Sequence, residues 1–243
     1  MIWRSAGRLV AKIRRQPPKD EPIARDPFLE LALRSIVPGW LHHGNVELFD
    51  YCLANLPSAA PVIEIGSFAG LSLNTIIYLL KRHGRSNPVF SVDEWTWRNP
   101  NRADVFRADT VSMEEHRHLV METFRRNVSL YSRSNLPHHI VANSDRFFAE
   151  WAACNSTTDF FSREVALGGP ISFAYIDGDH SYEQSLKDFQ NISKHLEVGG
   201  FVVFDDSWDE SPWQCARTAR EAAERSDYRL VDKRPNFCLQ KIA

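Results

Sequence analysis

The chain has 243 residues, 43% of them hydrophobic, which is enough to bury the core of one domain. Its formal net charge of -2, with Lys and Arg mixed among Asp and Glu, provides no basic field for a nucleic-acid backbone, so no nucleic-acid partner is expected. Its four cysteines form no CxxC pair, and no apolar run approaches the roughly 18 residues of a membrane span, so a cytoplasmic protein is expected.

The N-terminal segment, residues 1–26, is predicted to be a basic tail that precedes a single domain over residues 27–243. Residues 1–19 contain no acidic side chain and six basic ones, Arg4, Arg8, Lys12, Arg14, Arg15 and Lys19. As a helix, this segment would gather Ile2, Ala6, Leu9, Val10 and Ile13 on one face. Two interpretations stay open: a helix on an anionic membrane surface, which would make the protein peripheral to a membrane, or a solvated tail.

Apolar periodicity predicts helices and strands that alternate along the rest of the chain. The first two helices are expected over residues 27–37 and 45–56, the second with Asn45 as its N-cap. Further helices are expected over 71–80, 144–151, 182–196 and 212–225, and strands over 61–65, 89–92, 139–141, 171–176, 201–204, 228–231 and 237–240. This order predicts an α/β fold with a Rossmann-like, doubly wound, seven-stranded sheet, mostly parallel with an antiparallel last strand.

Two stretches do not follow the alternation, residues 94–136 and residues 155–170. The first contains a helical pattern over residues 112–130. We interpret it as an insertion that serves as a lid or a substrate element.

The turn after the first strand is the first candidate ligand site, because ligands of such sheets bind beyond the carboxyl ends of the strands. Phe68 and Leu71 stand where a dinucleotide-binding turn needs glycines, so NAD is disfavoured. S-adenosylmethionine has no phosphate and suits this looser turn, although glycines also serve purely structural turns. The candidate cofactor contacts of the turn are Glu64, Gly66, Ser67, Gly70 and Ser72.

Two further strand ends carry candidate cofactor contacts. Asp93 ends the second strand, where a carboxylate can accept hydrogen bonds from ribose hydroxyls. The alternative is that Asp93 is only a strand-end or cap carboxylate. Glu94 could take the role of Asp93. Ser144, beside Asn143 and Asp145, could reach an adenine or could simply cap the helix that follows.

Acidic residues follow two later strands, at Asp177 and at the pair Asp205 and Asp206. If these strands are neighbours, three carboxylates meet at one rim, and Mg²⁺ would relieve their repulsion and lower the pKa of an acceptor hydroxyl. His180 is the better candidate for the base that removes the hydroxyl proton, and Asp179 is the alternative. The competing interpretation is that these acids only cap helices and end strands.

Four tryptophans and one arginine stand beside these loops and could line an acceptor pocket, although tryptophans also serve as ordinary core. This set consists of Trp95, Trp97, Arg98, Trp208 and Trp213.

The motifs at residues 63–72, 91–93, 175–183 and 199–206 together resemble the class I methyltransferase family called methyltransferase 24. They are also similar to the metal-dependent sugar O-methyltransferases of macrolide and aminocoumarin biosynthesis. The resemblance implies S-adenosylmethionine contacts at Glu64, Gly66 and Asp93. It further implies Mg²⁺ ligands at Asp177, Asp205 and Asp206, with Asp177 also near the cofactor, and a base at His180 or Asp179.

We therefore expect O-methylation of a small-molecule or glycan acceptor. The acceptor, the metal and assembly into a homo-oligomer are left open. The alternatives are a metal-independent methyltransferase of the same fold and a non-catalytic nucleoside-binding or membrane-associated domain.

Overall fold

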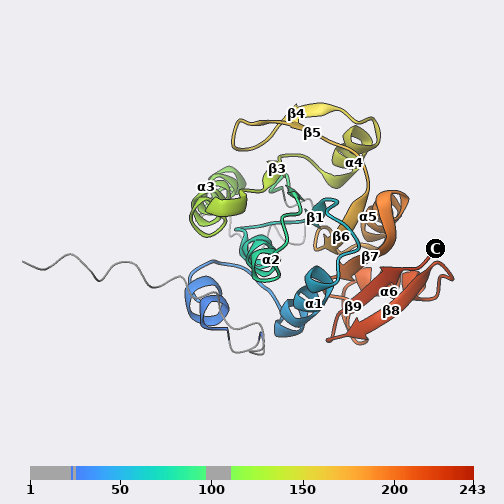
Figure 1. The fold of residues 1–243 in the computed structure, drawn as a ribbon. Coiled ribbons are helices and arrows are strands. Elements are labelled where there is room, and N and C mark those ends of the chain that lie inside the picture. Colours follow the sequence, from blue (N-terminus) through green and yellow to red (C-terminus); the bar gives the residue numbers. More distant parts are fainter. Residues whose placement is uncertain (1–22, 24–25, 97–110) are drawn as a thin grey trace, which may run out of the picture.

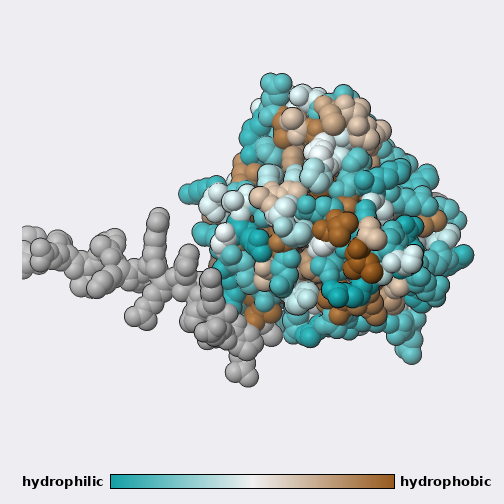
Figure 2. Space-filling view, turned by 45° about the vertical axis from the view of Figure 1, so that its right-hand side comes forward, coloured by the Kyte–Doolittle hydropathy of each residue, from teal (hydrophilic) through white to brown (hydrophobic). Residues whose placement is uncertain are grey.

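A computed structural model describes residue 23 and residues 26–96 and 111–243. The basic segment at residues 1–19, Trp97 and Arg98 lie outside the described residues, and so do the expectations attached to them. The described part of the chain contains no helix that is both long and apolar enough to cross a membrane. Figure 2 shows one face of the molecule, on which hydrophilic residues predominate and hydrophobic ones are scattered.

The predicted seven-stranded sheet is confirmed, with the order β3-β2-β1-β6-β7-β9-β8 (Figure 1). Its strands are β1 Val62–Ile65, β2 Val89–Val92, β3 His138–Ile140, β6 Ile171–Ile176, β7 Leu196–Phe204, β8 Tyr228–Lys233 and β9 Phe237–Lys241. β9 pairs antiparallel with both β7 and β8, whereas the other pairs are parallel, as the short connection between the last two strands predicted.

Helices cover both faces of the sheet, because successive strand residues point to opposite sides. Val62 belongs to the core that contains residues of α1, α2 and α3, and Ile63 to the core that contains residues of α4, α5 and α6. The helices are α1 His43–Ala54, α2 Leu71–Arg82, α3 Met113–Tyr131, α4 Ser144–Ala152, α5 Tyr182–His195 and α6 Cys215–Ala223, with the short π-helix η2 Phe28–Leu33 and the 3-10 turn η4 Arg133–Asn135.

The predicted start of α1 is wrong. His42 is the N-cap, and its side chain accepts a hydrogen bond from the Gly44 N–H. Asn45 lies inside the helix and is fully buried. An asparagine at a helix start is usually a cap, but this one is drawn inward by polar partners described below.

Two short strands were missed, β4 Ser156–Thr158 and β5 Glu164–Ala166, which pair with each other as an antiparallel hairpin. Each has three residues, none of them fully buried, so the hairpin carries no alternation of apolar and polar residues that sequence could reveal.

The helix predicted over residues 112–130 forms as α3, and Ser112 and Glu115 cap it reciprocally. Val120, Phe124 and Val128 are buried against the core. Asn127 donates a hydrogen bond of 2.9 Å to the carbonyl oxygen of Ala69, in the turn after β1. This part of the insertion is therefore anchored beside the first candidate site.

Candidate functional site

The turn after β1 lies directly against the end of β6. Gly66 has a φ of 83°, and a Cβ atom there would lie 1.9 Å from the carbonyl oxygen of Asp177. The backbone N–H of Asp177 donates to the Ile65 carbonyl, and that of Gly66 to the Val92 carbonyl, both at 2.9 Å. Glycine is thus required by both conformation and space, and the turn is fixed against two strand ends.

Asp93, at the end of β2, fastens the same turn. One carboxylate oxygen accepts hydrogen bonds from the backbone N–H groups of Ser67 and Phe68 at 2.9 and 3.0 Å. The other accepts from the Trp95 N–H at 2.7 Å. Burial raises the pKa of Asp93, and these three donors oppose that shift. The ribose contact of Asp93 stays a prediction.

Glu64 in β1 is a buried carboxylate. It is 0% exposed, and neither oxygen has a hydrogen-bond partner among the described residues. The Ser67 hydroxyl beside it is likewise buried and without a partner there. Burial raises the pKa of Glu64 to about 8, although the nearby Ser72 and Ser67 hydroxyls oppose the shift. Such orphaned polar atoms are costly in a folded protein and are typical of ligand sites.

This carboxylate predicts a pH dependence of stability. Because its pKa is higher in the folded than in the unfolded chain, the folded state holds the proton more tightly, and the free energy of unfolding falls as pH rises from about 4.5 to 8. Glu64→Gln should remove on the order of 3 kcal/mol of this fall between pH 5 and 8. Urea unfolding of the cofactor-free proteins measures it, and parallel pH profiles of the two proteins would contradict the buried charge.

The remaining predicted cofactor residues lie around the same strand ends. Gly70 is the N-cap of α2 with a φ of 88°, and Ser72 is buried in its first turn. The alternative that Ser144 caps α4 is wrong, because Asn143 is the cap and accepts from the Arg146 N–H. The Ser144 hydroxyl instead donates to Asp188 at 2.6 Å, and its adenine contact stays a prediction.

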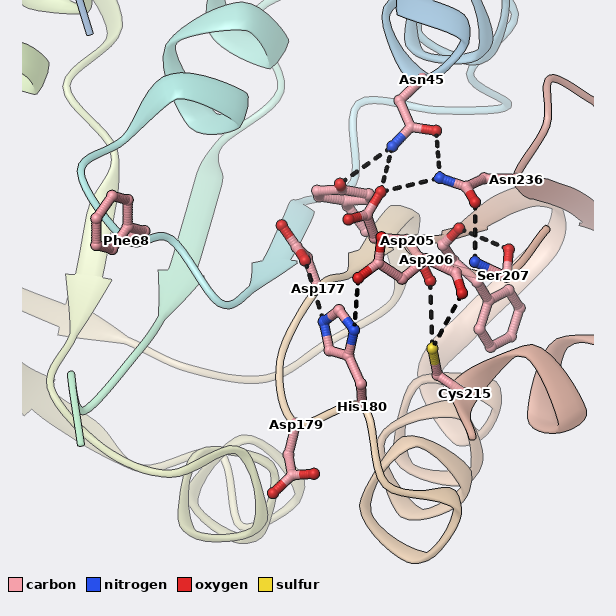
Figure 3. Close-up of polar contacts among 12 residues, drawn as sticks. Asn45, Phe68, Asp177, Asp179, His180, Asp205, Asp206, Ser207, Cys215 and Asn236 are labelled. Atoms are coloured by element: carbon pink, nitrogen blue, oxygen red, sulfur yellow. Dashed lines mark hydrogen bonds and ion pairs between the residues drawn. The ribbon is translucent and has the colours of Figure 1, made fainter. Parts of the chain in front are cut away.

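The acidic residues lie at the ends of β6 and β7, which are parallel neighbours with Ile176 opposite Phe204. Figure 3 shows the His180 ring between two of the carboxylates. Its Nδ1 lies 2.9 Å from Asp206 Oδ2, and its Nε2 lies 3.5 Å from Asp177 Oδ1. The Trp213 ring packs edge-on at 5.2 Å from the His180 ring.

Charge dominates this cluster. Burial lowers the pKa of His180, but the hydrogen bonds with Asp177 and Asp206 outweigh it and raise the pKa to about 12. Burial and the charge of Asp205 raise the pKa of Asp177, and burial and the charge of Asp206 raise that of Asp205. A pKa raised this far favours the protonated form of His180, so His180 can act as a base only after it releases that proton, which requires that its carboxylate partners are engaged elsewhere.

Asp179, the alternative base, is exposed and points away from the cluster in Figure 3. Its Oδ1 accepts a hydrogen bond of 2.8 Å from the Ser181 N–H, so it lies at the start of α5. Asp179 therefore lies outside the cluster that Asp177, His180 and Asp206 form.

The donor set suits a hard divalent cation, because three carboxylates carry more negative charge than one imidazolium balances. Within residues 26–96 and 111–243, however, no three His, Cys, Asp or Glu side chains are arranged to hold a metal ion. The imidazole ring lies between Asp177 and Asp206, so a metal would require this ring to be displaced from at least one carboxylate.

Sequence reasoning missed two residues of the site, Asn45 and Asn236. Both are buried, and both donate hydrogen bonds to Asp205. Of the tryptophans proposed for an acceptor pocket, Trp95 is 1% exposed and stacks on the buried ring of His139, so it belongs to the core.

A family model described as "Methyltransferase domain" matches residues 63–207. Among curated proteins, an uncharacterized protein of Acanthamoeba polyphaga mimivirus is 42% identical over 43 residues, which are 18% of this chain and only 20% of that protein's length.

Solved structures share the fold. The O-methyltransferase from Bacillus cereus in complex with S-adenosylhomocysteine is 12% identical, with a TM-score of 0.55 over 91% of this chain and 93% of that one. The O-methyltransferase NovP is 18% identical, with a TM-score of 0.52 over 82% and 80%. A TDP-rhamnose 3'-O-methyltransferase of calicheamicin biosynthesis is 16% identical, with a TM-score of 0.51 over 81% and 77%.

Proposed function

This chain belongs to the methyltransferase-domain family, and on that basis we propose that it transfers the methyl group of S-adenosylmethionine to a hydroxyl group, assisted by Mg²⁺. The observation that carries the cofactor is the turn after β1. There Gly66 brings the backbone against Asp177, and the buried carboxylate of Glu64 lacks a partner among the described residues. A ligand that carries a positive charge and hydrogen-bond donors, as the methionine part of the cofactor does, suits this site.

In the proposed reaction, the acceptor oxygen attacks the sulfonium methyl carbon, the carbon–sulfur bond breaks, and sulfur keeps the electron pair. The hydroxyl proton passes to a base, for which His180 is the nearest candidate beside the acidic rim. Asp177, Asp205 and Asp206 would hold the metal. Bound Mg²⁺ would lower the pKa of the acceptor hydroxyl. Asp93 and the turn after β1 would keep the cofactor in place.

A sugar hydroxyl is the acceptor class that we favour. One support is that a TDP-rhamnose 3'-O-methyltransferase has a similar fold. The other is that Trp208 and Trp213 are half-buried near the acidic rim, since indole rings pack well against sugar faces. A metal-independent methyltransferase is the second candidate. It is favoured by the His180 cation, which already lies between two carboxylates.

Methyl transfer from radiolabelled S-adenosylmethionine to a panel of sugars, glycosides and phenols tests the proposal. We expect label on the oxygen of a hydroxyl-bearing acceptor, identified by mass spectrometry. Label found only on nitrogen or carbon atoms of its products would contradict the proposed O-methylation.

A further inference from the structure

Two successive carbonyl groups of the turn after β1 are held by side chains from the insertion at residues 94–136. Trp95 donates a hydrogen bond from Nε1 to the Phe68 carbonyl oxygen at 2.9 Å. Asn127, in α3, donates from Nδ2 to the Ala69 carbonyl oxygen, also at 2.9 Å. The insertion therefore reaches the proposed cofactor site from two of its segments.

The backbone at this place is strained and needs such support. Phe68 has a φ of 40° and Trp95 a φ of 51°, values in the left-handed region that bulky side chains seldom adopt. Such conformations persist only where the surrounding structure imposes them. Asp93 supplies one set of contacts, because its carboxylate accepts from the backbone N–H groups of both residues. The Trp95 indole supplies a second link between the same two residues.

The Trp95 indole is itself held on several sides. It is 1% exposed and stacks on the ring of His139 in β3, with ring centroids 4.4 Å apart. Phe124 of α3 and Phe160, between β4 and β5, pack edge-on against it at 5.2 and 5.3 Å. These rings fix the direction in which the indole N–H points, so the hydrogen bond to Phe68 is set by the packing around it.

α3 lies directly against the other end of the turn. A Cβ atom on Gly70 would lie 3.0 Å from Val128 Cγ2 and 3.4 Å from Phe124 Cδ2, both in α3. Asn127 adjoins Val128 in the chain, so the same approach of helix and turn brings its amide to the Ala69 carbonyl. The position of α3 and the shape of the turn are therefore linked.

We propose that Trp95 and Asn127 are positioning residues through which the insertion holds the turn after β1 in its cofactor-binding shape. This inference rests on the proposed function, in which that turn binds S-adenosylmethionine. When one of these donors is lost, the strained turn can relax, and the apparent affinity falls in proportion to the fraction of molecules that keep the binding shape. The insertion, which the sequence predicts to be a lid or a substrate element, thus also sets the affinity for the cofactor.

Calorimetric titration of S-adenosylhomocysteine into the full-length protein tests this inference. Trp95→Phe keeps a ring among the aromatic neighbours but lacks the indole N–H, and we expect it to weaken binding by about 10-fold. Asn127→Ala removes the second donor and should weaken binding by about fivefold. Asn127 is only partly buried, so this variant is expected to fold even if Trp95→Phe does not.

The matched control is Trp151→Phe. Trp151, in α4, is also 1% exposed, packs edge-on against Phe90 at 5.1 Å and donates from Nε1 to the Gly169 carbonyl oxygen at 3.0 Å. It belongs to the core on the opposite face of the sheet from Trp95. Trp151→Phe should lower the urea midpoint about as much as Trp95→Phe but leave affinity for S-adenosylhomocysteine within about twofold of the wild type. An equal loss of affinity in this control would reduce the effect to general destabilisation and overturn the inference.

Other outcomes are separable. Unchanged affinity in both Trp95→Phe and Asn127→Ala overturns the inference and leaves the proposed function intact. A loss in only one of the two variants overturns the role of the other residue. Wild-type protein that does not bind S-adenosylhomocysteine contradicts the proposed function, and the inference fails with it.

Discussion

Gly66→Ala is expected to abolish binding of S-adenosylhomocysteine, with a loss of at least about 100-fold in affinity, and to lower the free energy of unfolding by about 3 kcal/mol. The new methyl group would lie 1.9 Å from the Asp177 carbonyl oxygen and 2.6 Å from its carbon, so main chain and not a flexible side chain must move. Either β6 shifts, which disturbs the acidic rim, or the turn shifts, which breaks its hydrogen bonds to Asp93. Calorimetry and urea unfolding measure the two effects.

Gly169→Ala is the matched control. Gly169 has a φ of 91°, close to that of Gly66, but no heavy atom lies within 4 Å of where its Cβ would be. It should therefore show the conformational cost of about 1–2 kcal/mol without loss of ligand affinity. Equal effects of the two substitutions on affinity would show that the contact of the turn with Asp177 is unimportant for binding.

Asp205→Ala is expected to lower the rate of methyl transfer by about 1000-fold while leaving affinity for S-adenosylhomocysteine largely intact. Loss of a metal ligand removes several kcal/mol of stabilisation from the transition state, and each 1.36 kcal/mol is about tenfold in rate. Turnover with the acceptor found in the transfer assay is the measurement, and wild-type enzyme in EDTA should lose activity to a similar extent.

Two variants make this comparison specific. Asp205→Asn keeps an oxygen that can accept from Asn45 and Asn236 but removes the charge, so it should fold well and still lose turnover. Asp209→Ala removes an acidic side chain that is 71% exposed, and it should leave turnover unchanged. Full activity of Asp205→Ala, or of the wild type in EDTA, would contradict the metal role and favour the metal-independent enzyme.

Much of the fold was predictable because buried strands appear in the sequence as short, continuous runs of apolar residues. The run Ile171–Ile176 is buried at every position, and its boundaries were predicted as the structure has them. The sequence placed Asp177 and Asp205 after two buried strands and left open whether these strands are neighbours, and the structure pairs them in parallel. Local pattern and chain order are sufficient for such features.

The asparagine pair could not be found this way. Asn45 and Asn236 are separated by 191 positions, and no spacing links them. At a helix start, Asn45 matched the signal of an N-cap, which a tertiary contact overrode. Similarly, the sequence offered His180 as a neutral base, whereas its contacts with Asp177 and Asp206 make it a cation, because charge depends on three-dimensional neighbours.

The central claim is that the strand ends around Gly66 and Glu64 form a nucleoside site for S-adenosylmethionine. Isothermal calorimetry of the full-length protein with S-adenosylhomocysteine, with and without Mg²⁺, tests it most directly. We expect saturable binding with a micromolar dissociation constant in both conditions, because Glu64, Gly66 and Asp93, which would contact the cofactor, are not among the residues that would hold Mg²⁺. Absence of binding in both conditions would contradict it.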